Sequence, residues 1–136
     1  MNTFVRNILA VIAGFIAGSV ANMGLIMIGG SVIAPPAGVD PSNMESIRAA
    51  IHLFEPKHFL FPFLAHAVGA FAGGLVASVI SANRAMLLAM ITGGLFLLGG
   101  LATAFLIPAP AWFIVLDLVL AYIPMALLGW KLAGED

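Results

Sequence analysis

The sequence predicts an all-α integral membrane protein, with four transmembrane helices in a compact bundle and a short amphipathic helix between the first two. The first observation is composition: 62% of the 136 residues are hydrophobic and only 8% are charged. A soluble domain carries roughly 25% charged residues, and a soluble fold of this size could not bury so much apolar surface. The second observation is that the apolar runs are continuous, whereas barrel strands would alternate apolar and polar residues.

The four predicted spans are residues 7–33, 58–81, 85–107 and 111–132, and they form a single transmembrane domain over residues 1–136. Each span exceeds the ~20 residues that a helix needs to cross a ~30 Å hydrocarbon core. Arg6, the apolar run after it and the small residues "SVA" also resemble a cleaved signal peptide. The apolar region of a signal peptide is only ~7–15 residues long. This run continues to Ile33, which favours a retained helix.

The loop after the first span contains a predicted amphipathic helix over residues 41–55. Asp40 followed by Pro41 is one helix-start signal, and Ser42 with Glu45 is a competing capping box. An apolar face recurs at helical spacing, at Met44, Ile47, Ile51 and Phe54. The opposite face is ionic and carries Glu45, Arg48, His52 and Glu55. Such a helix either rests among the lipid headgroups or covers the bundle as an interfacial lid.

The positive charges orient the predicted bundle. Arg6, Arg84 and Lys131 fall on the face that holds both termini, and Arg48 and Lys57 fall on the other. Positive residues in short loops favour the cytoplasm, so we expect both termini to be cytoplasmic, in a bacterial inner membrane. The net charge of -1 provides no basic patch for nucleic acid. The expected partners are the lipid bilayer and either further copies of this chain or another membrane protein.

Small residues mark the predicted helix contacts. Helices in a bilayer associate where small side chains let their backbones approach, and such contacts form within one chain or between chains. The predicted packing residues are Gly14, Gly18, Ala65, Gly69, Gly73, Ala77, Gly93, Gly94, Gly99 and Gly100.

Three polar residues within the spans form the candidate site. His66 and Asp117 are ionisable and Asn22 is a strong uncharged hydrogen-bonding group. Ionisable side chains in hydrocarbon usually face the bundle interior and pair with one another. We therefore expect His66 to pair with Asp117, either as a structural hydrogen bond or as a site that handles protons or ions. A third interpretation leaves the two residues unpaired at interfaces. Pro124 is expected to kink the fourth span.

No cofactor is predicted. The chain lacks cysteine, which removes thiolate metal sites. The segment "HLFEPKH" places His52, Glu55 and His58 close together, but their spacing is not that of a zinc site and Pro56 interrupts the helix. The sequence therefore predicts no metal site.

Three functions fit these observations. The first is a non-enzymatic accessory, scaffold or assembly subunit that packs through its glycine and alanine faces. The second is a small oligomeric transporter or channel, coupled to protons or ions, that uses His66, Asp117 and Asn22. The third is a membrane enzyme for a lipid-soluble substrate, with His66 as base and Asp117 orienting it.

Overall fold

The structure, a computed structural model, describes residues 1–134 and is helical without strands over that range. Its α-helices are α1 (Thr3–Val32), α2 (Met44–Ala50), α3 (Leu60–Ile80), α4 (Ala85–Leu106), α5 (Ala111–Leu120) and α6 (Ile123–Leu132). Two 3₁₀ turns, Ile51–Leu53 and Pro56–Phe59, join α2 to α3. Four helical segments are long and apolar enough to cross a membrane: Thr3–Val32, Pro56–Ile80, Ala85–Leu106 and Ala111–Leu132.

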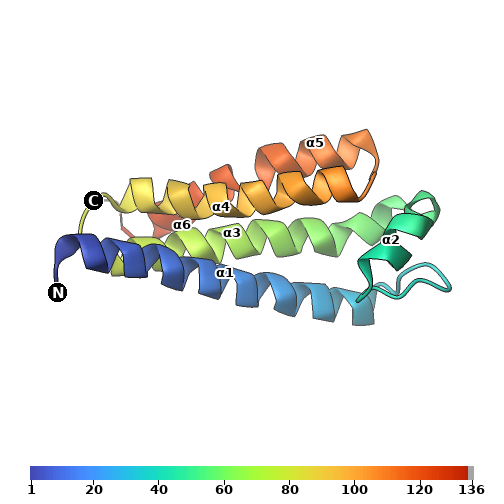
Figure 1. Cartoon of the computed structure of the whole chain (residues 1–136), viewed down its shortest axis with the longest axis horizontal. Helices are drawn as coiled ribbons and strands as arrows, with labels where there is room; N and C mark the ends of the chain where they lie inside the picture. Colours follow the sequence, from blue (N-terminus) through green and yellow to red (C-terminus); the bar gives the residue numbers. More distant parts are fainter. Residues whose placement is uncertain (135–136) are drawn as a thin grey trace.

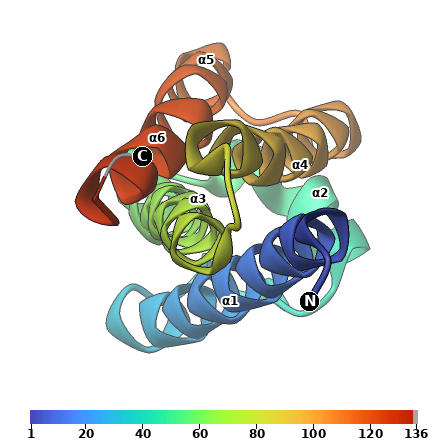
Figure 2. The same cartoon turned by 90° about the vertical axis from the view of Figure 1, so that its left-hand side faces the viewer.

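Helix α3 runs through the middle of the bundle and contacts α1, α4 and α6 (Figure 1). Viewed along the bundle, α1 lies on one side of α3, and α4 and α6 lie on the others (Figure 2). Helix α1 begins, and helix α6 ends, on the side of the molecule opposite α2 (Figure 1). We call that the terminal end, and the end that carries α2 the loop end.

The contact between α1 and α3 is a contact between backbones. A Cβ added at Gly14 would lie 2.5 Å from the carbonyl oxygen of Gly73, and one added at Gly18 would overlap the carbonyl of Gly69. Because no side chain fits between the helices at these two levels, they approach far more closely than helices separated by larger residues. Ala77 completes the stripe at zero exposure.

A second close contact joins α3 to α6. A Cβ at Gly74 would overlap the backbone of Ala126, and a Cβ at Gly129 would overlap the carbonyl of Phe71. Gly93 of α4 meets the side chain of Ala126 from the other side. The bundle is therefore built around a central helix with glycine on two of its faces.

The predicted packing residues divide into two groups. Ala65 is fully buried, and Gly14, Gly18, Gly69, Gly73, Ala77 and Gly93 contact other helices within the chain, while Gly100 contacts Tyr122 between α5 and α6. Gly94 and Gly99 do not, since a Cβ added at either would meet nothing within 4 Å. Because the sequence leaves contacts within one chain and between chains open, a contact with another chain stays a prediction for these two positions.

Polar contacts fasten the terminal end. Asn7 donates from Nδ2 to Oδ1 of Asn83 at 2.8 Å and accepts from the backbone N–H of Ala82 at 2.9 Å. Arg6 Nε donates to the carbonyl oxygen of Ile80 at 2.6 Å. These bonds tie the start of α1 to the turn between α3 and α4. Helix α1 begins at Thr3 rather than Asn7 because Oδ1 of Asn2 caps it, accepting from the N–H of Phe4 at 2.7 Å.

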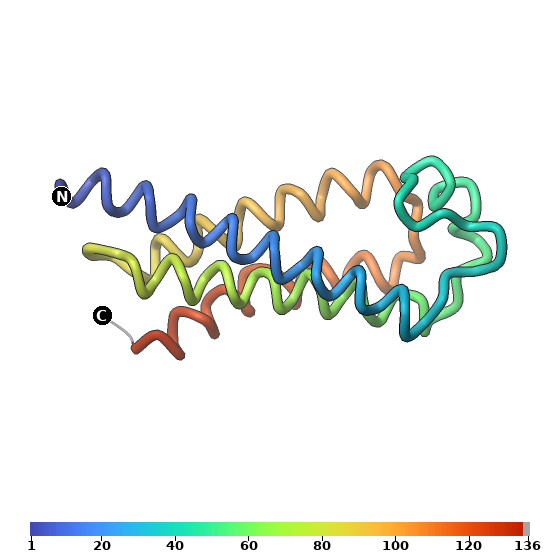
Figure 3. Tube along the Cα trace, turned by 90° about the horizontal axis from the view of Figure 1, so that it is seen from below, coloured from blue at the N-terminus to red at the C-terminus, as the bar shows by residue number. Residues whose placement is uncertain are grey.

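Helices α1 and α4 diverge toward the loop end, which both side views show (Figures 1 and 3). At the terminal half, glycine contacts with α3 fix α1 in place. At the loop end, α2 and the connecting turns lie across the opening that the divergence leaves (Figure 3). The space between α1 and α4 is therefore bounded by α3 on one side and by the loop at the loop end.

The fourth span is broken rather than bent. Helix α5 ends at Leu120 and α6 starts at Ile123, with Ala121 and Tyr122 between them. Pro124 occupies the first turn of α6, and because it lacks an N–H it cannot donate a hydrogen bond to the carbonyl oxygen of Leu120 in the preceding turn. The expected distortion at Pro124 is confirmed, and it is a full interruption of the helix.

The loop helix is shorter than predicted. Helix α2 begins after Asn43, whose Oδ1 accepts from the N–H of Ser46 at 3.1 Å, and α-helical structure ends at Ala50 rather than residue 55. Asp40 does not cap it, because its Oδ1 accepts from the N–H and hydroxyl of Ser42 at 3.0 and 2.6 Å. Both bonds favour the ionised carboxylate and lower the pKa of Asp40, and the bond from the Ser42 hydroxyl has the larger effect.

Substituting glycine on α1 should separate contact positions from open ones. Gly14→Ala places a Cβ 2.5 Å from the Gly73 carbonyl, and overpacking of this kind costs about 1–3 kcal/mol. Gly24→Ala, on the same helix, meets nothing within 4 Å and removes a weak helix former, so its stability should be unchanged or slightly higher. Thermal unfolding in detergent, followed by circular dichroism, measures the difference. Equal transition temperatures for the two variants would contradict the backbone contact.

Candidate functional site

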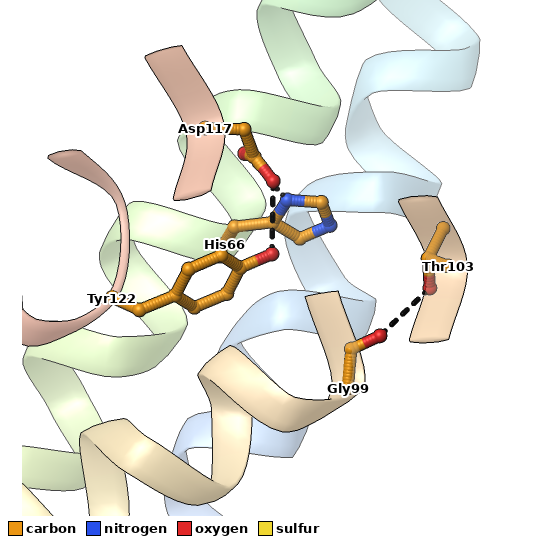
Figure 4. A network of polar contacts seen from close by, with 5 residues as sticks. All are labelled: His66, Gly99, Thr103, Asp117 and Tyr122. Atoms are coloured by element: carbon orange, nitrogen blue, oxygen red, sulfur yellow. Dashed lines mark hydrogen bonds and ion pairs between the residues drawn. The ribbon is translucent and has the colours of Figure 1, made fainter. Parts of the chain in front are cut away.

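The structure brings His66 of α3 and Asp117 of α5 together. His66 Nδ1 lies 2.8 Å from Asp117 Oδ1, within hydrogen-bonding distance. Asp117 is only 5% exposed, which makes it the most deeply buried carboxyl group in the described part of the chain. The carboxyl group projects from the last turn of α5 toward the imidazole ring (Figure 4).

Tyr122 is the third member of this group. Its hydroxyl donates to Asp117 Oδ2 at 2.9 Å, and its ring stacks on the His66 ring with centroids 5.6 Å apart. Both carboxyl oxygens are therefore engaged, and buried polar atoms that are fully partnered avoid the cost of lost hydration. Gly100 makes room for this arrangement, since a Cβ there would lie 2.5 Å from the Tyr122 hydroxyl.

Tyr122 was not among the residues that the sequence predicts for the site. It follows Asp117 by five residues, which on a continuous helix would turn it well away from Asp117. The break between α5 and α6 brings the two side chains together. The sequence holds a signal, because Tyr122 is the only tyrosine in the chain and precedes by two residues the proline of a segment long and apolar enough to cross a membrane.

The hydrogen bonds define the state of the His66 ring. An ionised Asp117 has only acceptor oxygens, so the bond at Nδ1 requires the ring to donate its proton from that nitrogen. The neutral ring then carries its lone pair on Nε2. Figure 4 shows Nε2 on the side of the ring away from Asp117, facing toward Thr103. Thr103 uses its own hydroxyl to donate to the Gly99 carbonyl at 3.0 Å.

Two cavities meet at His66. The loop-end cavity, of about 270 Å³, lies between α1 and α4, and its walls include Ile26, Ile33, Ile51, Phe54, Ile107 and Phe113. The central cavity, of about 210 Å³, is lined by Asn22, His66, Gly69, Phe96, Gly99, Gly100, Thr103 and Tyr122. His66, Gly100 and Thr103 line both. The three predicted polar residues thus share one continuous region, with Asn22 at the central cavity and Asp117 at the loop-end cavity.

The loop covers the loop-end cavity with its apolar side. Ile47, Ile51 and Phe54 line this cavity. The four predicted ionic residues, Glu45, Arg48, His52 and Glu55, are all exposed and line neither cavity. Met44 departs from the predicted apolar face, being 49% exposed.

An aromatic cluster lies at the loop end of this cavity. Phe59 is 5% exposed and packs against Phe113 with ring centroids 4.6 Å apart. Trp112 and Phe54 contact the same ring at 5.7 and 5.8 Å. This cluster joins the loop to the start of α5.

The remaining histidines and acids do not assemble a metal site within residues 1–134, where no group of three His, Cys, Asp or Glu is suitably placed. His58 Nδ1 accepts from the backbone N–H of Glu55 at 2.8 Å, as part of a capping box around the turn Pro56–Phe59. Its ring orientation is therefore set by the backbone.

Comparisons with protein-family models, with curated proteins and with solved structures found no match to this chain.

The tautomer of His66 follows from the geometry. Neutral His66 should carry its proton on Nδ1, whereas His58, whose Nδ1 accepts a hydrogen bond, should carry it on Nε2. In Asp117→Asn the side-chain amide can donate to Nδ1, so the His66 proton should move to Nε2. Nitrogen-15 NMR of histidine-labelled protein distinguishes the two tautomers, with His58 as internal reference. An Nε2–H tautomer for His66 in the unsubstituted protein would rule out this bonding pattern.

The Tyr122 bond should depend on the carboxylate. Tyr122→Phe leaves Oδ2 of Asp117 buried without its donor, which costs about 1–3 kcal/mol. In an Asp117→Asn background the same substitution should cost less, because no buried charge is left unpaired. A double-mutant cycle of unfolding free energies in detergent measures this coupling. Strictly additive effects would show that the two side chains do not stabilise one another.

Proposed function

We propose that this chain is a small, non-enzymatic membrane carrier of a bacterial inner membrane, with both termini in the cytoplasm. In this proposal a small, mainly apolar molecule occupies the cavities and exchanges a proton with His66. The membrane location is supported by the four apolar segments, and the orientation by Arg6, Arg84 and Lys131 at the terminal end.

One observation carries the proposal: the His66 ring lines both cavities, and Asp117 fixes its orientation through a hydrogen bond at Nδ1. Ligand sites in proteins are mostly apolar, with a few fixed polar groups that orient the ligand. The lining of the loop-end cavity fits this description, with aliphatic and aromatic side chains around one oriented imidazole. A histidine backed by a buried carboxylate can take up and release a proton without losing its position.

The position of the cavities favours a carrier over an open channel. Both cavities lie toward the loop end, from Asn22 onward on α1. Toward the terminal end, the backbones of Gly14 and Gly73 are in contact. A route that is open toward one end and packed at the other corresponds to one state of an alternating-access carrier, in which one part of the bundle rocks against another.

A scaffold role has less support from the glycine residues. Gly14, Gly18, Gly69, Gly73, Gly74, Gly93 and Gly129 are used for contacts within the chain. They therefore do not supply a surface for another protein in this arrangement.

Cysteine accessibility tests the carrier. The chain has no native cysteine, and Gly30, Gly99 and Gly94 each accept a Cβ without meeting any atom within 4 Å. Gly30 lines the loop-end cavity, Gly99 lines the central cavity and Gly94 lines neither. We expect a membrane-impermeant methanethiosulfonate reagent, added to vesicles from the loop end, to modify Gly30→Cys and Gly99→Cys faster than the matched control Gly94→Cys.

The same variants distinguish a carrier, which opens to both sides of the membrane, from a binding site that opens to one side only. In inverted vesicles, Gly99→Cys should still react, because a carrier opens its central cavity to both sides, whereas Gly30→Cys should react more slowly. Lack of reaction at Gly99→Cys from the terminal end would refute the carrier. Equal reaction of all three variants from the loop end would refute the cavities as a water-accessible route.

A further inference from the structure

The groups that line the cavities define the chemistry of a ligand. Five of the lining side chains are ionisable: Lys57, His58, His66, Asp117 and Tyr122. Asp117 carries the only carboxyl group among these lining residues. Both of its oxygens already accept hydrogen bonds, from His66 and Tyr122. A ligand cation would therefore meet no free carboxylate on these walls.

The group that does face the cavities is a proton acceptor. With Nδ1 donating to Asp117, His66 presents the lone pair of Nε2, and no hydrogen bond to Nε2 is formed within residues 1–134. The ring is about one quarter exposed, at 24% of its side chain. A ligand group that fits this nitrogen must donate a hydrogen bond, as the O–H of a carboxylic acid does.

The loop end adds positive charge. Lys57 and His58 line the mouth of the loop-end cavity, where the side chain of Lys57 is 63% exposed. A cationic group at an entrance attracts anions and raises their local concentration. Lys57 also pairs with Glu55 at 3.5 Å, an exposed contact that a ligand carboxylate can replace at little cost.

The walls between these two points are apolar. Ile26 and Ile33 of α1, Ile51 and Phe54 of the loop and Ile107 after α4 line this part. Figure 3 shows that α1 and α4 diverge here, and residues of both helices line the cavity. An alkyl chain that follows these walls stays within apolar surroundings along its length.

We propose that the ligand of this site is a single-chain amphipathic weak acid, bound with its carboxyl group at His66 and its alkyl chain between α1 and α4. The ligand arrives as the neutral acid from the bilayer, or as an anion that is attracted by Lys57 and takes up a proton from water at the cavity entrance. Within the site, the acid O–H donates to Nε2. Transfer of that proton breaks the O–H bond, forms Nε2–H and leaves an imidazolium between the ligand carboxylate and Asp117. No other reactant is needed, and the inference rests on the carrier proposed above.

A ligand series of constant chain length tests the head group. Protein in phosphatidylcholine nanodiscs is equilibrated with radiolabelled decanoate, and unlabelled decanoate, decanol and decyltrimethylammonium are compared as competitors. We expect decanoate to compete best, decanol less well and the quaternary cation least. His66→Phe should weaken decanoate binding by about tenfold or more, as expected for loss of a hydrogen bond to a charged group.

Two further variants keep the result interpretable. Asp117→Asn retains the imidazole but turns Nε2 into a donor, so it should bind the decanoate anion without the proton uptake that accompanies binding to the unsubstituted protein. This readout remains even where His66→Phe fails to fold. Gly94→Ala, which lines neither cavity, should bind decanoate like the unsubstituted protein.

The outcomes separate the two proposals. Tightest binding of the cation, or equal binding of decanol and decanoate, would overturn the weak acid and leave the carrier standing. Decanoate binding no greater than to empty nanodiscs would overturn the weak acid, while the carrier itself is overturned by lack of reaction at Gly99→Cys from the terminal end. Equal proton uptake on decanoate binding in the unsubstituted protein and in Asp117→Asn, measured as a pH change in weakly buffered solution, would also exclude the role given to His66.

Discussion

The arrangement of this protein depends on the close approach of α3 to its neighbours. Where Gly14 and Gly18 meet Gly73 and Gly69, α1 lies against the backbone of α3, and α6 lies against the opposite side at Gly74. In a bilayer, helix association comes from such close packing rather than from hiding apolar surface. Helix α1 follows α3 as far as Gly29, which meets the side chain of Phe61, while α1 and α4 diverge toward the loop end and the loop-end cavity lies between them.

The second constraint is the burial of Asp117. A carboxylate removed from water needs partners for both oxygens, and here His66 and Tyr122 supply them. The partners come from different elements, α3 and the interruption before α6, so the acid also joins α5 to the rest of the bundle. Satisfying the acid fixes one face of the imidazole and leaves the other nitrogen facing the cavities. The polar site and the helix arrangement are therefore consequences of the same contacts.

Much of this could be predicted from the sequence. Long apolar runs specify the helices, and the rarity of ionisable groups within them makes His66 and Asp117 an obvious pair. The remainder depends on which way each helix faces. Glycine shows where close approach is sterically allowed, but not where a neighbour lies. The predicted packing residues therefore omit Gly74 and Gly129, which α3 and α6 use against each other, and include Gly94 and Gly99, which meet no neighbour within this chain. Tyr122 could not be placed beside Asp117 without knowing that the helix stops at Leu120.

The interruption of the fourth span also has a mechanical consequence. Helix α6 is clamped against α3 through Gly129 and Ala126, whereas α5 extends from the break toward the loop end. A rigid rod pivoting at Ala121 moves each of its points in proportion to the distance from the pivot. Asp117 is four residues away, or ~6 Å, and Trp112 is nine residues away, or ~14 Å. A rotation of α5 about Ala121 therefore moves Trp112 and the aromatic cluster more than twice as far as the carboxylate. The cavity entrance can widen in this way while Asp117 stays beside His66.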